Sequence, residues 1–182
     1  MRMKPVALPI RLLAPVLATL LPAAVVQAQA LFGGVDTRMT PEQVIATLPG
    51  ASVPATPAKL HGGEREQVRI DELRIGGHAF TGSVYYGENG LSQLMLNLSR
   101  RDLPPAEALA VYDAVLAELS TRHGPPARSQ DFLDDPQAPE REARWQAPGQ
   151  DIALLYIGNS DGKGGYLSLL NVLFRPVPAA NQ

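Results

Sequence analysis

Cysteine is absent from this chain of 182 residues. Its absence excludes thiol catalysis, zinc sites with thiolate ligands and a lipid attached to an N-terminal cysteine. Disulfides are excluded as well, so the stability of the folded chain must come from packing. The length beyond the first thirty residues suits one domain with a core of its own.

Motifs of metal binding and phosphate binding are also missing. The histidines His61, His78 and His123 do not have the spacing of a His-x-x-x-His or His-Glu-x-x-His site. No Gly-x-x-x-x-Gly-Lys loop is present to hold a phosphate. We therefore expect no catalytic residue, no cofactor and no metal site, and the protein is more readily interpreted as a non-enzyme.

The N-terminal thirty residues have the pattern of a secretory signal peptide. Arg2, Lys4 and Arg11 form a basic start, an apolar run continues to Val26, and Ala28-Gln29-Ala30 is a small-x-small cleavage site. The apolar run is short and interrupted by proline, which disfavours a membrane span. The sequence predicts residues 1–30 as signal peptide, 31–176 as a single domain and 177–182 as a flexible tail. The mature protein would be periplasmic or secreted, with no integral membrane span.

Charge disfavours nucleic acid as a partner. Residues 1–30 hold three of the sixteen basic residues and none of the eighteen acidic ones, so the remainder carries a net charge of −5. A mildly acidic domain is soluble but repels polyanions.

Periodicity and turn signals predict an α+β fold, in which two helices pack on a largely antiparallel meander sheet. Thr40, Pro41 and Gln43 predict a capped helix start, and a longer helix is introduced by Asp102 and ended by Gly124. Residues 51–64 read as a surface loop. The predicted strands are Gln67–Ile75 with a bulge at Asp71-Glu72, His78–Gly87, Leu91–Ser99, Arg128–Leu133, Arg141–Ala147 with Trp145 in the core, Asp151–Asn159 and Tyr166–Arg175. A helix followed by strands occurs twice in the predicted order, which allows a duplicated helix-plus-strands unit.

The last two predicted strands, Asp151–Asn159 and Tyr166–Arg175, are apolar on both faces, whereas an antiparallel strand with one solvent-exposed face alternates between apolar and polar residues. Either the rest of the chain covers both faces, or the second face meets another chain. On the second interpretation, we expect partner contacts from Leu155, Ile157, Leu170, Val172 and Phe174, although strand parity does not decide which residues point outward.

The segment from Val35 to Gly50 resembles the opening of small bacterial envelope proteins. These include the small lipoprotein of the outer-membrane barrel-assembly machinery and the related β-lactamase-inhibitor-like fold. The segment reads Val-Asp-Thr-Arg-Met-Thr-Pro-Glu-Gln-Val and ends in Leu-Pro-Gly, with Arg38 where the family has glycine. The resemblance implies helices packed on a meander, and proteins that bind other proteins without catalysis.

These observations favour an exported, non-enzymatic binding domain of the cell envelope, whose partner is another envelope protein or a second copy. One alternative is an envelope hydrolase using the carboxylates of Asp134, Asp135, Glu140 and Glu142. Another is a secreted enzyme inhibitor that inserts the 51–64 loop or a hairpin tip into its target.

Overall fold

The computed structural model describes residues 32–135, 138–160 and 165–177. Its described part has the predicted α+β fold, with two helices and one antiparallel sheet of eight strands. The predicted signal peptide and all but the first residue of the predicted tail lie outside the described residues.

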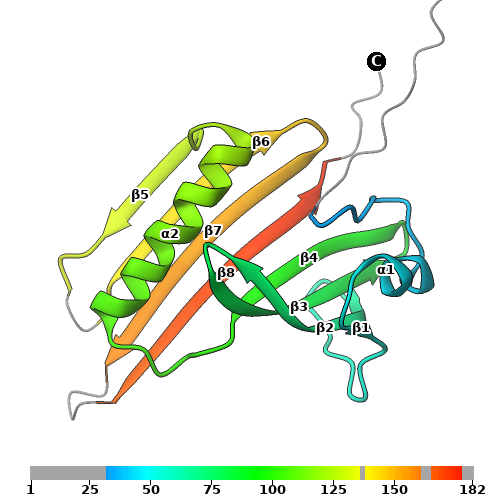
Figure 1. Ribbon diagram of the computed structural model, residues 1–182, viewed down its shortest axis with the longest axis horizontal. Coiled ribbons are helices and arrows are strands. Elements are labelled where there is room, and N and C mark those ends of the chain that lie inside the picture. The colour runs from blue at the N-terminus through cyan, green and yellow to red at the C-terminus, as the bar shows by residue number, and fades with distance from the viewer. Residues whose placement is uncertain (1–31, 136–137, 161–164, 178–182) are drawn as a thin grey trace, which may run out of the picture.

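Two similar halves build the sheet. The first contains α1 (Pro41–Thr47), β1 (Ala51–Ser52), β2 (Arg65–Ile75), β3 (His78–Gly87) and β4 (Gly90–Leu98). The second contains α2 (Pro105–His123), β5 (Arg128–Phe132), β6 (Glu140–Ala147), β7 (Gln150–Ser160) and β8 (Tyr166–Pro176). The strand order is β1-β2-β3-β4-β8-β7-β6-β5, so the halves join where β4 pairs with β8 (Figure 1). Each half is therefore a helix followed by four strands. The first half gains its fourth strand from β1, within the segment predicted as a loop.

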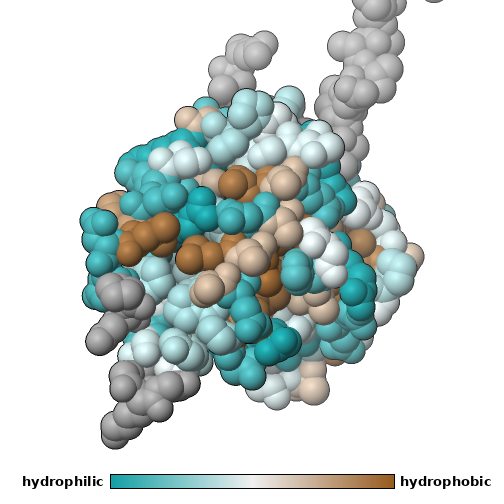
Figure 2. Space-filling view, turned by 60° about the vertical axis from the view of Figure 1, so that its left-hand side comes forward, coloured by the Kyte–Doolittle hydropathy of each residue, from teal (hydrophilic) through white to brown (hydrophobic). Residues whose placement is uncertain are grey.

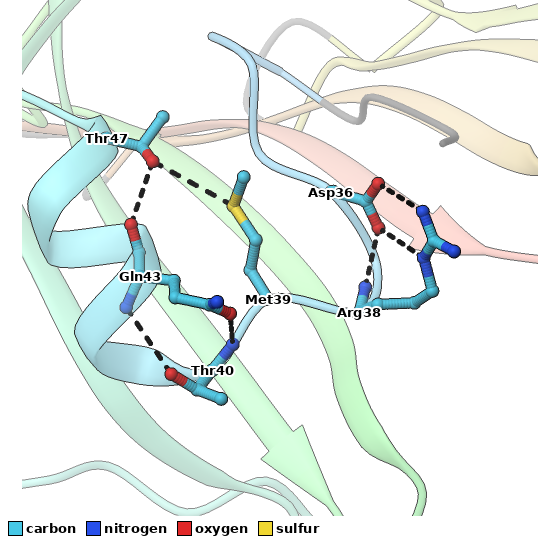
Figure 3. A network of polar contacts seen from close by, with 6 residues as sticks. All are labelled: Asp36, Arg38, Met39, Thr40, Gln43 and Thr47. Carbon is cyan, nitrogen blue, oxygen red and sulfur yellow. Dashed lines mark hydrogen bonds and ion pairs between the residues drawn. The ribbon is translucent and has the colours of Figure 1, made fainter. Parts of the chain in front are cut away.

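Helix α1 begins as the sequence predicts. The Gln43 backbone N–H donates to the Thr40 hydroxyl, and the Gln43 side chain accepts from the Thr40 backbone N–H, which completes a capping box (Figure 3). Thr47 donates to the Gln43 carbonyl and contacts the sulfur of Met39. With only seven residues, the helix depends on packing, which Val44 and Leu48 provide from the core.

The β2–β3 hairpin bends toward α2. A register shift between Ile70 and Leu73 confirms the predicted bulge, and it brings Leu73 onto the same face as Ile70. Gly76 and Gly77 have φ angles of 59° and 79°, which suit a two-residue turn. The Gly76 N–H donates to the carboxylate of Glu118 in α2, so the hairpin tip packs against the middle of that helix (Figure 1).

Helix α2 starts later than predicted. Pro104 is its N-cap and makes no side-chain capping bond, whereas Asp102 lies outside the helix and pairs with Arg100 at 3.6 Å. Pro105, at the first helical position, has no backbone N–H to satisfy and a φ angle that suits a helix start. The helix ends at Gly124 with a φ of 80°, as predicted.

One face of the sheet, the inner face, carries both helices and a single core. Helix α2 packs on β6, β7 and β8 through Ala108, Val111, Tyr112, Val115 and Leu119. Trp145 is buried beneath its C-terminal end, as predicted, and donates from Nε1 to the Gly124 carbonyl at 2.9 Å. Arg141 lies over the Tyr112 ring at 4.6 Å and bonds Asp113 and Asp131, which ties α2 to β5 and β6.

Candidate functional site

The five residues expected at a partner interface divide between the two faces of the sheet. Leu170, Val172 and Phe174 are at most 1% exposed and belong to the core of the inner face. They alternate along β8 with residues of the opposite face, so they are not available to a partner of the folded chain. Leu155 is half-buried and Ile157 is 45% exposed, both on the opposite face, which we call the outer face.

An apolar patch lies on the outer face of the last four strands. Phe132, Ile157 and Leu169 occupy one row across the strands, because Phe132 pairs with Glu140, Glu140 with Ile157, and Ile157 with Leu169. Ile157, Leu167 and Phe132 are 45%, 47% and 57% exposed. Figure 2 views the molecule from the edge that carries β5, where hydrophobic residues are seen among hydrophilic ones, and the outer face is turned away in this view. The members of this patch are Phe132, Leu155, Ile157, Leu167 and Leu169.

A hollow of about 390 Å³ lies beside the patch, toward the other end of the same strands. Another row of residues across β5, β6, β7 and β8 lines it, namely Arg128, Arg144, Ala153 and Leu173. Arg175 lines it from the next row. The three guanidinium groups, with Asp151 as the one carboxylate of the lining, give this hollow a local positive charge in an acidic domain.

The arginines of the hollow differ in their partners. Arg144 pairs with Glu142 on its own strand, and Arg175 donates to Oε1 of Gln93 at 2.8 Å. Arg128 makes no ion pair with any other residue that the structure describes. The charges of Arg128 and Arg175 are therefore not offset by an ion pair within the described residues, and an incoming carboxylate can approach them.

The outer face of the first half is closed by a buried carboxylate. Glu66 is 1% exposed and accepts two bonds from Arg69, at 2.8 and 2.6 Å. It also accepts from the Ser83 hydroxyl at 2.8 Å and the Ala58 backbone N–H at 2.9 Å. Burial alone would raise the pKa of Glu66, but these four donors outweigh it and lower that pKa. Because every donor comes from the chain itself, the cluster ties residues near Ala58 to the sheet and offers nothing to a ligand.

The carboxylates of the hydrolase alternative do not converge on a cleft. Asp134, Asp135 and Glu140 are exposed, and Glu142 is occupied by Arg144. None of the four lines the hollow. No observation of the structure favours glycosidase chemistry at these residues.

Ser160 lies in two sequence patterns that are typical of hydrolases. It is the serine of a Gly-x-Ser-x-Gly run from Gly158 to Gly162 and of a Ser-x-x-Lys run to Lys163. A nucleophile elbow joins a strand to a helix, whereas Ser160 ends β7 and the next element is strand β8. Lys163 lies outside the described residues. The strand context therefore disfavours a nucleophile elbow at Ser160.

The histidines and the helices show no other site. Burial, followed by the charge of Arg122, lowers the pKa of His123 at the end of α2. Within the described residues, no group of three or more histidines, aspartates or glutamates is arranged to hold a metal ion. Neither helix of that part has the length and apolar character needed to cross a membrane.

The residues that carry the family resemblance act locally. Asp36 accepts from the backbone and the guanidinium of Arg38, which lowers the pKa of Asp36, and Thr40 and Gln43 cap α1 (Figure 3). Comparison with family models, with curated proteins and with solved structures gave no significant match. The resemblance therefore stays a prediction.

Proposed function

We propose that this chain is an exported, non-enzymatic binding domain that docks a protein partner on the outer face of β5–β8. The observation that carries the proposal is the position of Phe132, Ile157 and Leu167, three large hydrophobic side chains that stay about half exposed on one sheet face. Contiguous apolar patches on a soluble domain commonly mark interaction sites.

Docking on this face has a plain energetic basis. Covering the remaining exposed area of a large apolar side chain contributes about 1 kcal/mol, so the whole patch contributes several kcal/mol before the entropic cost of association. The adjacent arginines favour one orientation of the bound partner, because charged groups at the rim of an interface affect specificity more than affinity.

The export part of the proposal rests on the sequence of residues 1–30. Intact-mass measurement of the protein recovered from the periplasm or medium of expressing bacteria should give a chain that starts near Leu31. Recovery of the unprocessed chain from the cytoplasm alone would contradict it.

A photo-crosslinking experiment tests the docking face. A photoreactive amino acid at Leu155, on the outer face, should give a crosslinked product in cells, whereas the same group at Thr121, exposed on α2, should not. The partner, identified by mass and purified, should then bind the unmodified chain.

Variants test whether the patch carries that binding. Ile157→Asp should abolish it, and Val53→Asp, at a side chain 74% exposed in the loop after β1, should leave it unchanged. Equal crosslinking at Leu155 and Thr121, or equal binding by the two aspartate variants, would contradict the proposed face.

A further inference from the structure

The outer face of β5–β8 is complementary to itself. Three parallel rows cross these strands, two residues apart. The first is the basic row of Arg128, Arg144, Ala153 and Leu173. The middle row is Gln130, Glu142, Leu155 and Asn171. The third is the row of Phe132, Glu140, Ile157 and Leu169.

Two such faces can meet across a two-fold axis in two simple ways. An axis parallel to the strands sets each row against itself in reverse order, so, with the axis between β6 and β7, Arg144 meets Ala153 and Glu140 meets Ile157. This arrangement buries charged groups against apolar ones, which is unfavourable. An axis perpendicular to the strands, lying between the sheets, reverses the strand direction and sets the first row against the third. Leu155 then lies over Leu155 at the centre.

The second arrangement sets Glu142 over Glu142 of the other copy, although each of these carboxylates is bonded to its own Arg144. In the outer two rows it brings unlike charges together and apolar groups together. Arg144 lies over Glu140 of the other copy, and Ala153 lies over Ile157. The hollow that Arg128, Arg144 and Arg175 line is where the incoming Glu140 carboxylate arrives. Glu140 is exposed and pairs with no cation among the residues that the structure describes, so it is available for this contact. Two-fold symmetry makes each contact twice.

The area available suits a dimer of moderate affinity. Four strands about 4.8 Å apart and on average about 30 Å long present about 600 Å² per copy. The total of about 1,200 Å² lies at the lower end of specific interfaces. Sheets that pack face to face with aligned strands are a common arrangement.

We infer that the partner of the outer face is a second copy of this chain, packed sheet against sheet with reversed strand direction. This inference rests on the proposed docking face and adds its occupant and orientation. The decisive contacts are Leu155 on Leu155 and Arg144 on Glu140.

Sedimentation of the purified chain from roughly 1 to 200 µM tests the inference, because interfaces at the lower end of the size range are often transient, and this range covers micromolar dissociation constants. The chain should change from monomer to dimer over this range, and Ile157→Asp should remain monomeric. Arg144→Glu and Glu140→Arg should each raise the dissociation constant about tenfold or more, since each replaces two attractions by two repulsions. The double variant should recover most of the affinity.

The matched control is the exposed pair of Glu72 and Arg74 on the β2–β3 hairpin, which are 3.1 Å apart. Glu72→Arg, Arg74→Glu and their combination should leave the dissociation constant unchanged. Arg144→Glu also places two carboxylates side by side with Glu142, so thermal unfolding is checked, and Glu140→Arg alone keeps the test valid if Arg144→Glu does not fold.

A chain that stays monomeric would overturn the inference, as would a dimer whose two charge reversals do not rescue each other. The proposed docking face would still stand after either result if crosslinking at Leu155 identifies a different protein. Both ideas fail together only if the face captures neither a second copy nor another chain.

Discussion

Replacing Gly76 by alanine tests the packing of the β2–β3 hairpin against α2. A Cβ built at Gly76 would lie 2.8 Å from the carbonyl carbon of Ala114 and 2.8 Å from the nitrogen of Val115, both in the backbone of α2. Backbone atoms in the middle of a helix cannot move aside as a flexible side chain can. The hairpin tip would therefore have to retreat, which weakens the bond from Gly76 to Glu118.

The magnitude follows from two contributions. Alanine at a φ of 59° costs about 1 kcal/mol of backbone strain. Overpacking against the helix costs about 1–3 kcal/mol more. The sum lowers the free energy of unfolding by about 2–4 kcal/mol, a large fraction of the stability of one domain.

Gly77 supplies the control because its φ is 79° and no atom lies within 4 Å of its would-be Cβ. Gly77→Ala should cost only the strain of about 1 kcal/mol. Urea denaturation followed by tryptophan fluorescence suits the comparison, since Trp145 is the one tryptophan of the chain and is buried. Equal losses for the two variants would refute the close approach of the hairpin to α2.

Three further predictions concern single contacts. Glu66→Gln should lower the free energy of unfolding at pH 7 by about 2 kcal/mol, because it breaks the buried pair with Arg69. The pKa of Glu66 is lowered by folding, so its contribution is present above the ordinary glutamate pKa and is lost as the pH falls through the folded value. Denaturation curves from pH 7 to 3 should therefore show wild type losing its advantage over the variant on acidification, and a constant difference would contradict this. Trp145→Phe should cost about 1–2 kcal/mol by leaving the Gly124 carbonyl without its donor, as thermal unfolding would show. Thr40→Ala should cost about 1 kcal/mol through the lost cap of α1, whereas Ser52→Ala, at an exposed position, should cost almost nothing in the same assay.

Local signals predicted most of the fold because they act within a few residues. The Thr40 cap, the Gly76-Gly77 turn and the Gly124 helix end all satisfy or free nearby backbone groups. Strand parity likewise placed Trp145 in the core. The start of α2 was missed because Asp102 is a good cap by type, but Pro104 occupies the position.

The site was harder to predict because it depends on pairing between distant strands. Parity groups Leu170, Val172 and Phe174 correctly, but it cannot tell which group faces the helix. The hollow joins Arg128 to Arg175 through the register of four strands, which no local pattern reveals.

Glu66 was missed for a different reason. By parity, Glu66 would share the face of Val68, but a register shift between them places it opposite Tyr85 on the outer face. A single glutamate before an apolar strand reads as solvent-exposed unless the bulge is known. Only the three-dimensional pairing with Arg69 and Ser83 reveals that it is buried.

The two halves of the sheet share a topology but treat the outer face differently. In the first half, that face carries Glu66, Ser83 and Tyr85, which are at most 9% exposed. The bond from Ala58 to Glu66 ties down the chain between β1 and β2 there. In the second half, Phe132 and Ile157 of that face are about half exposed. Since α2 covers the inner face of this half, these two side chains lie outside the core, and their exposure is the feature on which the proposed docking face rests.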